Sequence, residues 1–333
     1  MSSDIPRLVL HCGIHKTGTT TLQVALESLR AQLRAHGVAL ITISQMKKMQ
    51  HDQGWAAYRK GPHLKSPLWT AEFRTLVTDE MAAVERESGR PADQVLVTNE
   101  RMVGARMPST VDHPIFRPLA ERAIGQVLAS LEPDEVHVAL YTRRQDRLIE
   151  SCYLWEVQKG LSHTVREQFP FIDEPVMRFS ELAERLTAIP GVSSIRVRPF
   201  ETIAAGSLAY LDDFLGNVGL QGALDLSVFD GDPSANRSYS QKALDVALAL
   251  NPFLETNKQR NATRQFLKQA FPVGRHPAAA ILSEEERLHL IDIYRDDNER
   301  LFRTWMPDLP ADSYSTLEGT DKLRDVLSGL SLG

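Results

Sequence analysis

Two glycines near the amino end of the chain frame a segment with the chemistry of a phosphate-binding loop. The segment GIHKTGTT follows the apolar run LVL, and four residues separate its two glycines. Glycines permit a tight turn and a close approach of an anion to backbone N–H groups, and a helix after the turn adds the positive end of its dipole. The pattern predicts a strand, a phosphate-holding loop and a helix. The residues expected at the phosphate are Gly13, His15, Lys16, Thr17, Gly18, Thr19 and Thr20.

The position of Lys16 inside the loop separates it from the loops of ATP- and GTP-hydrolysing enzymes. Those enzymes carry lysine directly after the second glycine and a magnesium-binding Ser or Thr next, whereas Thr19 follows Gly18 here. A mid-loop ammonium group can reach a group attached directly to a single bound phosphate. A phosphate–sulfate anhydride fits, because a sulfuryl group carries less charge than a phosphoryl group and can be handled without a metal. A plain strand–helix turn is the alternative, since Gly and Thr are common in turns.

A second polar cluster follows the apolar run EVHVALYT over residues 135–142. Arg143 would end a parallel strand, at the sheet edge where open α/β folds bind ligands. Ser151 lies eight residues further on, within the helix expected over 146–159. A guanidinium can fork onto phosphate oxygens, and a hydroxyl can add a hydrogen bond. The cluster predicts a second phosphate site, with a solvated charged turn as the alternative.

Together these segments resemble the sulfotransferases that use 3′-phosphoadenosine 5′-phosphosulfate (PAPS). GIHKTGTTTLQ resembles the family's 5′-phosphosulfate loop, and Arg143 with Ser151 matches the Arg and Ser that bind the donor's 3′-phosphate. The Asn-Pro that follows this Arg in the family is replaced by Arg144 and Gln145, as expected of bacterial members, which leaves open whether Arg144 shares the contact. The segments VRPFETI, LDDFLGNVGL, ANRSYS and YRDDNERL extend the resemblance over most of the chain.

The resemblance implies a P-loop-like sulfotransferase fold and in-line transfer of a sulfuryl group from PAPS to a hydroxyl or amine. The product would be adenosine 3′,5′-bisphosphate, and no metal would take part. Lys16 would stabilise charge on the oxygen between phosphorus and sulfur. The ANRSYS segment would contribute nucleotide contacts from Asn236, Arg237 and Ser238.

Sulfuryl transfer requires a general base that takes the acceptor's proton, and the family uses Glu or His. Glu100 follows the run QVLVTN and would place a carboxylate at the sheet edge beside the loop. A structural glutamate that caps a helix or pairs with Arg101 and Arg106 is an equal alternative. His15, inside the loop, is the second candidate for the base or for orienting the donor.

Residues 44–69 and 101–117 are expected to form loops on the acceptor side. The first segment holds five Lys or Arg against one acid, together with Trp55, Tyr58 and Trp69. Aromatic faces and cations suit a carbohydrate or small-metabolite acceptor, including one that is already anionic. A surface lid with a solvated basic face is the alternative.

Strand-like runs alternate with amphipathic helical segments, which predicts an α/β fold with a parallel central sheet flanked by helices. Leucines at steps of three and four predict one helix over 19–36, ended by Gly37: Leu22, Leu26, Leu29 and Leu33. The expected strands cover 7–12, 38–43, 94–98, 135–142 and 194–200. Further helices are expected over 70–88, 115–131, 146–159, 176–188, 207–217, 240–250, 258–270 and 283–304. We interpret residues 1–333 as one domain whose helical part, 230–333, packs on the core.

Composition is that of a globular protein without an overall attraction for polyanions. The chain has 333 residues, 42% hydrophobic and 24% charged, with a net charge of −5, so a nucleic-acid partner is not expected. Cys12 and Cys152 fall in expected core elements, and Cys152, Leu148 and Trp155 would share the buried face of one helix. Reduced thiols, a cytoplasmic location and no membrane span are expected, because no apolar run approaches the roughly 20 residues that a bilayer requires. These patterns carry no signal for an oligomeric state.

Two other functions stay open at this stage. A P-loop kinase or NTPase would use VLVTNE as a Walker-B-like strand, but it should carry Lys after Gly18 and has no use for Arg143 with Ser151. A non-catalytic nucleotide-binding relative would keep the fold, but it has no use for Lys16.

Overall fold

Five short strands, all parallel, form the centre of the molecule in the order β2-β3-β1-β4-β5. The structure is a computed structural model, and it describes residues 4–52, 71–99, 102–103, 119–229 and 238–330. The strands are β1 (Arg7–His11), β2 (Val38–Thr42), β3 (Gln94–Thr98), β4 (Glu135–Thr142) and β5 (Ser194–Pro199). The strands β2 and β3 are rich in Val, Leu and Ile and buried at every residue, as a parallel sheet covered by helices requires. The predicted α/β class is confirmed.

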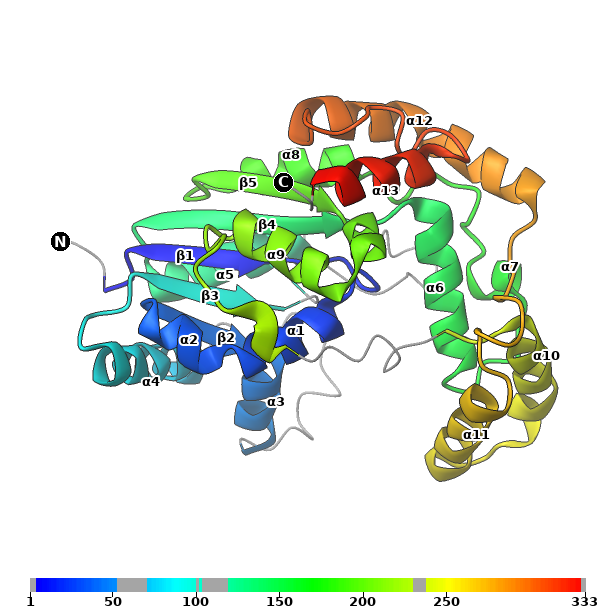
Figure 1. Ribbon diagram of the computed structural model, residues 1–333, viewed down its shortest axis with the longest axis horizontal. Coiled ribbons are helices and arrows are strands. Elements are labelled where there is room, and N and C mark those ends of the chain that lie inside the picture. Colours follow the sequence, from blue (N-terminus) through cyan, green and yellow to red (C-terminus); the bar gives the residue numbers. More distant parts are fainter. Residues whose placement is uncertain (1–3, 53–70, 100–101, 104–118, 230–237, 331–333) are drawn as a thin grey trace.

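Helices cover both faces of this sheet (Figure 1). The first eight are α1 (Thr19–Ser28), α2 (Arg30–Ala35), α3 (Ile43–Asp52), α4 (Ala71–Ser88), α5 (Leu119–Leu131), α6 (Gln145–Val157), α7 (Val165–Gln168) and α8 (Phe179–Thr187). The next are α9 (Ser207–Asn217), α10 (Gln241–Leu250), α11 (Asn257–Ala270), α12 (Glu284–Trp305) and α13 (Gly319–Leu330). Three short 3₁₀ helices are η3 (Phe200–Ala205), η4 (Leu226–Val228) and η5 (Asn251–Phe253). Within the described ranges, no helix combines the length and apolar character that crossing a bilayer requires.

Two apolar clusters lie on opposite faces of the sheet. On one face, α1, α2 and α9 pack on Val9, Leu96 and Tyr141. On the other face, α4, α5 and α8 pack on a larger cluster that includes Leu10 and Val97. The alternation of Val9 and Leu10 between the two clusters follows from the two-residue period of a strand.

The helical prediction for 19–36 is wrong in one respect, because two helices meet at Leu29. Leu22, Leu26, Leu29 and Leu33 are all buried as predicted, and Gly37 adopts the positive φ of 79° expected where the second helix ends. The segment 44–69 is not a loop throughout, because α3 extends to Asp52. Helix α13 was not predicted at all.

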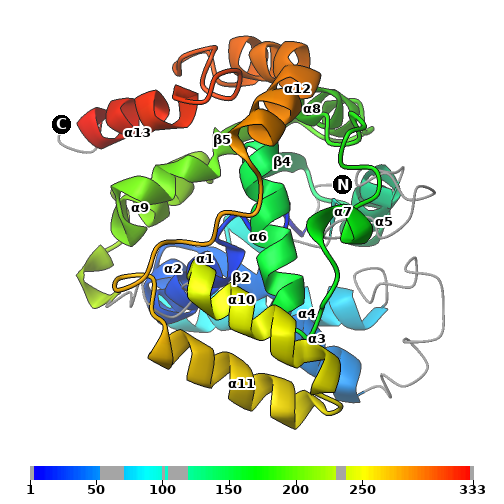
Figure 2. The same cartoon turned by 90° about the vertical axis from the view of Figure 1, so that its right-hand side faces the viewer.

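Helices α10 and α11 form an antiparallel pair that lies across the far end of α6 (Figure 2). The side-chain amide of Asn251 anchors it by donating to the carbonyl oxygens of Val157 and Leu161, at 2.8 and 2.7 Å. We call α10, α11 and the turn between them the helical arm.

Candidate functional site

The loop after β1 lies where the connections of the sheet diverge. From β1 the chain crosses towards β2 on one side, and from the adjacent β4 it crosses towards β5 on the other. Open α/β sheets bind ligands in the crevice at such a point, beyond the carboxyl ends of the strands. The topology therefore brings the two sequence motifs, after β1 and after β4, to the same crevice.

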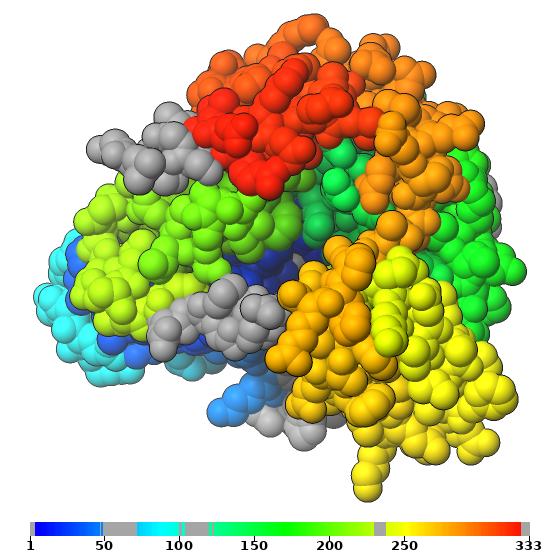
Figure 3. Space-filling view, turned by 45° about the vertical axis from the view of Figure 1, so that its right-hand side comes forward, coloured from blue at the N-terminus to red at the C-terminus, as the bar shows by residue number. Residues whose placement is uncertain are grey.

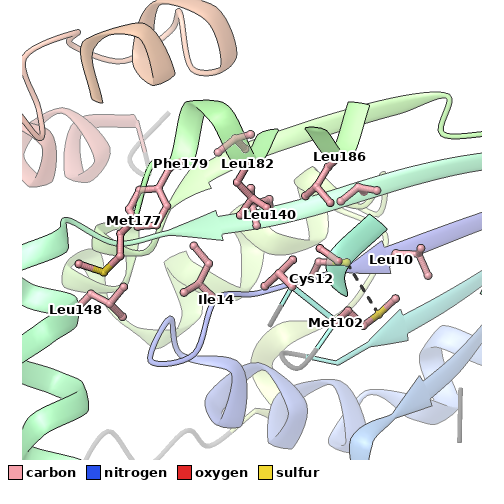
Figure 4. Close-up of a cluster of buried hydrophobic side chains, with 14 of the residues drawn as sticks. Leu10, Cys12, Ile14, Met102, Leu140, Leu148, Met177, Phe179, Leu182 and Leu186 are labelled. Carbon is pink, nitrogen blue, oxygen red and sulfur yellow. Dashed lines mark hydrogen bonds between the residues drawn. The ribbon is translucent and has the colours of Figure 1, made fainter. Parts of the chain in front are cut away.

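Apolar side chains tie the loop to the core beneath it. Cys12 and Ile14 point from the loop into the larger cluster, among Leu140, Leu148 and Phe179 (Figure 4). The Cys12 thiol lies 4.0 Å from the sulfur of Met102, and burial raises its pKa to about 12. Cys12 is therefore a protonated core residue, which leaves the backbone and polar side chains of the loop to face the crevice.

Glycine is required at the end of the loop for two reasons. Gly18 has a φ of 70°, a conformation that costs other residues energy, and it precedes the first turn of α1. A Cβ atom there would lie 2.7 Å from the Phe200 ring and 3.0 Å from the Tyr210 ring. The first turn of α1 carries no acidic residue, so its positive dipole end is not offset by a side chain of that turn.

Lys16 also adopts a left-handed conformation, with a φ of 71°, and its side chain is half-buried. Neighbouring hydrogen bonds brace this turn: the Thr17 hydroxyl donates to the carbonyl oxygen of Ile14, and the Tyr210 hydroxyl donates to that of Thr17 at 2.6 Å. A non-glycine residue with positive φ persists where surrounding contacts hold it, and such residues concentrate at functional sites.

Arg143 joins the two motifs. Its Nη1 atom donates to the carbonyl oxygen of Lys16 at 2.9 Å, and its guanidinium lies 5.0 Å from the centre of the Phe200 ring. Burial lowers the pKa of Arg143, and the negative charge of Glu201 opposes this shift. Arginine stays protonated in proteins, so a cation is held directly beside the loop.

Arg144 points away from the loop. Its guanidinium is buried, forms a two-point ion pair with Asp146 at 2.8 and 3.0 Å, and donates to the carbonyl oxygens of Thr316 and Leu317. Burial opposes ionisation of Asp146, but the bonds and charge of Arg144 hold its pKa below the usual value. Every guanidinium nitrogen of Arg144 is bonded within the fold.

A pocket of about 270 Å³ opens beside Arg143. Its lining residues are Arg143, Arg147, Phe200, Glu201, Ile203, Ala204, Thr320, Asp321 and Arg324. Three guanidinium groups thus border a pocket with two carboxylates, of which Asp321 is paired with Arg324. An anion of several charged oxygens is the ligand that such a set suits.

Ser151 lies on α6 two turns after the Arg143 turn, and its side chain is half-buried. Leu148 and Cys152 are buried on the core side of this helix, as predicted. Trp155 is not fully buried with them, and the Lys159 ammonium lies 5.3 Å from the centre of its ring. The prediction of Trp155 as core is therefore wrong.

The remaining candidates have different positions. His15 is buried in the loop and Thr19 at the start of α1, whereas Thr20 is exposed on α1 and Ser238 is exposed before α10. The candidates Glu100, Asn236 and Arg237, and most of the two expected acceptor loops, 44–69 and 101–117, lie outside the described residues. Asn99, which precedes Glu100, is buried at the sheet edge, where its N–H donates to the carbonyl oxygen of His11.

Three residues that sequence reasoning did not single out shape the site. Tyr210 braces the loop, and Glu201 accepts hydrogen bonds from the Tyr314 hydroxyl and from the backbone N–H of Arg144. Glu201 falls in the segment VRPFETI, which extends the family resemblance but did not indicate a role for this residue. Tyr210 and Tyr314 come from elements far away in sequence, and no local pattern marks them.

No three His, Cys, Asp or Glu side chains in the part of the chain that the structure describes come together as a metal site. Comparison with known proteins adds no family, because neither a family model nor a curated protein matches the chain. The functional conclusion therefore depends on the site's own residues.

Proposed function

We propose that this protein is a PAPS-dependent sulfotransferase with a P-loop-like sulfotransferase fold. The observation that carries the proposal is the hydrogen bond from Arg143 to the Lys16 carbonyl, which unites two anion-binding motifs 127 positions apart in sequence. A donor with a phosphosulfate at one end and a separate phosphate at the other accounts for both motifs. A nucleotide with one phosphate chain accounts for the loop alone.

The chain's residues would divide the chemistry as follows. Backbone N–H groups of the loop and of the start of α1 would hold the 5′-phosphate, and Arg143 with Ser151 would hold the 3′-phosphate. The acceptor oxygen attacks sulfur while the bond from sulfur to the bridging oxygen breaks, and the electron pair stays on that oxygen. Lys16 would stabilise the developing charge there, and the acceptor's proton would pass to Glu100 or His15.

Ligand binding tests the proposal directly. Adenosine 3′,5′-bisphosphate should raise the melting temperature more than AMP or ATP does, because it alone occupies both anion sites. Arg143→Ala should remove most of that advantage. Incubation with PAPS should release the bisphosphate in the presence of an acceptor and without added metal.

A kinase or NTPase would give a different outcome. Such an enzyme should bind ATP in a magnesium-dependent manner and more tightly than adenosine 3′,5′-bisphosphate. That result would reject the sulfotransferase proposal. Bisphosphate binding that persists in Lys16→Ala, with no activity in either protein towards any acceptor, would instead favour a non-catalytic nucleotide-binding protein.

A further inference from the structure

The helical arm carries positive charge that no carboxylate among the described residues pairs with. Residues 241–270 contain five Lys or Arg and two acidic residues, in a chain of net charge −5. Elsewhere most of the described arginines pair with a carboxylate. Within the described residues, no carboxylate lies within ion-pair distance of the arm's cations, so the arm presents a local excess of positive charge to anions.

Three of these cations form a line on α11. Arg260, Arg264 and Lys268 are spaced four residues apart, which puts them on one side of the helix at steps of about 6 Å. All three are half-buried. Burial lowers the pKa of Lys268, and the charge of Arg264 lowers it further. Like charges held together in this way are unfavourable without a counter-charge, and a bound anion would relieve the repulsion.

The line continues onto α6. Gly160 packs against Arg260, and a Cβ atom at Gly160 would lie 2.7 Å from the Arg260 Nε atom. Lys159, directly before it, contacts Trp155, which belongs to the least buried side of α6, the side that also carries Ser151. We call Trp155, Lys159, Arg260, Arg264 and Lys268 the cationic track.

The track begins at the end of α6 remote from the proposed nucleotide site. Helix α6 has 13 residues and spans about 20 Å from the turn after Arg143 to the arm. In the space-filling view, a hollow lies between α9, α13 and the segment that follows α11, and dark blue atoms from the start of the chain form its floor (Figure 3). The segment that follows the arm thus borders a hollow whose floor comes from the start of the chain.

We propose that the cationic track binds an acidic oligosaccharide, which is the acceptor of the sulfuryl group. Three cations in line over about 12 Å match an extended chain with several negative groups, because a single compact anion reaches one or two of them. Trp155 offers an aromatic face for a sugar ring beside the Lys159 cation. The role as acceptor rests on the proposed function, whereas the binding of the oligosaccharide does not.

An anionic membrane is the less fitting partner. Phe253 and Phe266 are the most exposed aromatic side chains near the arm's cations, at 77% and 59% exposure. Phe266 lies two residues from both Arg264 and Lys268, which places it on the opposite side of α11 from the track. Membrane-binding helices instead join their apolar side chains and flanking cations on one surface.

Calorimetry with a galacturonic acid hexamer, and with maltohexaose as the neutral counterpart, tests the proposal. We expect the acidic hexamer to bind, with an affinity that falls as salt is raised, and the neutral one to bind much more weakly. The double variant Arg264→Gln/Lys268→Gln should weaken binding by about tenfold or more, since two charge-assisted contacts are lost. Lys159→Gln, at an exposed position beside the Trp155 ring, should weaken it by a smaller factor.

Matched controls separate the outcomes. Arg300→Gln/Arg303→Gln on α12 removes the same charge from exposed positions and should leave hexamer binding within about twofold of the parent. If the two double variants weakened hexamer binding equally, the proposal that the cationic track binds the hexamer would be overturned. The proposal would also be overturned if the protein bound phosphatidylserine vesicles but not the hexamer, and if Phe253→Ser/Phe266→Ser abolished the binding to vesicles. Loss of the proposed function would appear separately, as a failure of the parent protein to bind adenosine 3′,5′-bisphosphate.

Discussion

At Lys16 an unfavourable backbone conformation and the proposed chemistry fall on one residue. A left-handed conformation costs an L-residue about 1–2 kcal/mol, and Lys16 adopts it with a φ of 71°. The hydrogen bond from Arg143 to its carbonyl oxygen and the braces at Thr17 hold the turn in place. The surrounding contacts therefore impose this conformation against the intrinsic backbone preference of lysine.

Substitution of Lys16 by Gly and by Ala separates the backbone from the ammonium. Both variants should lose sulfuryl transfer by about a hundredfold or more, because the charge at the bridging oxygen is gone. The Gly variant should be at least as stable to heat as the Ala variant, although glycine usually destabilises, since only glycine adopts this φ without cost. Thermal denaturation checks the order. A clearly less stable Gly variant would show that the turn is not held in the left-handed conformation.

Arg143→Ala should weaken the binding of AMP as well as that of adenosine 3′,5′-bisphosphate. AMP lacks the phosphate that Arg143 would contact, so a residue with that single role would leave AMP unaffected. The bond to the Lys16 carbonyl adds a second role, because its loss loosens the loop that holds the 5′-phosphate. Calorimetry with both ligands measures the two effects. An unchanged affinity for AMP would limit Arg143 to the 3′-phosphate.

At the scale of elements, the turn between β4 and α6 is held by parts of the chain that follow it at long distance. Glu201 of η3 accepts from the backbone N–H of Arg144, and Tyr314, before α13, donates its hydroxyl to the same carboxylate. Burial raises the pKa of Glu201, while the bond from Tyr314 and the charge of Arg143 oppose that shift. The pKa of Glu201 thus depends on burial and on these partners.

Tyr314→Phe should destabilise the protein by about 1–3 kcal/mol at neutral pH, because a buried carboxylate loses a donor. The folded-state pKa of Glu201 lies above its ordinary value, so protonation favours folding, and this contribution is lost as pH rises through the folded pKa. The variant raises that pKa further, so its deficit should shrink as pH falls from about 7.5 to about 5. Denaturant unfolding at both pH values measures the change. A deficit that grows towards acid pH would contradict the ionised Glu201.

The strands and most helices could be predicted because each buries a defined face in the core, and that burial sets the spacing of its apolar residues. The break at Leu29 could not be predicted, since the leucine spacing runs through both helices without interruption. Helix α3 has mostly polar residues after Thr42, and its few apolar residues (Ile43, Met46 and Met49) gave only a short helical period, so the sequence favoured a loop there.

In the candidate site, too, some features could be predicted from the sequence and others could not. The order of strands places Lys16 and Arg143 in one crevice, and the motifs alone indicated both residues. The direction of Arg144 could not be predicted, because Asp146 is a neighbour in sequence but the Thr316 and Leu317 carbonyls are not. The sequence describes the residues at an edge of the sheet, whereas the tertiary contacts decide which of them face the crevice.

At the scale of the whole molecule, parts from both ends of the chain lie next to Arg143. The loop with Lys16 comes from the amino-terminal part, and α13 supplies Thr320, Asp321 and Arg324 to the lining. Helix α13 is held by Leu323 and Leu327, which are buried, and by its contact with η3. Arg143 therefore links elements from the beginning, the middle and the end of the sequence, through its bond to Lys16 and its place in the pocket.

Two neighbouring positions on α13 should shift the affinity for adenosine 3′,5′-bisphosphate in opposite directions. Arg324→Gln removes one of the three guanidinium groups around the pocket and should weaken binding by about threefold to tenfold, whereas Asp321→Asn removes a carboxylate that pairs with Arg324 and should strengthen it. Both side chains are exposed, so neither variant should change the melting temperature of the ligand-free protein appreciably. AMP serves as the control ligand, and its affinity should respond to neither substitution. If both variants moved the affinities for AMP and the bisphosphate alike, α13 would act through the overall charge of the protein and not at a second phosphate.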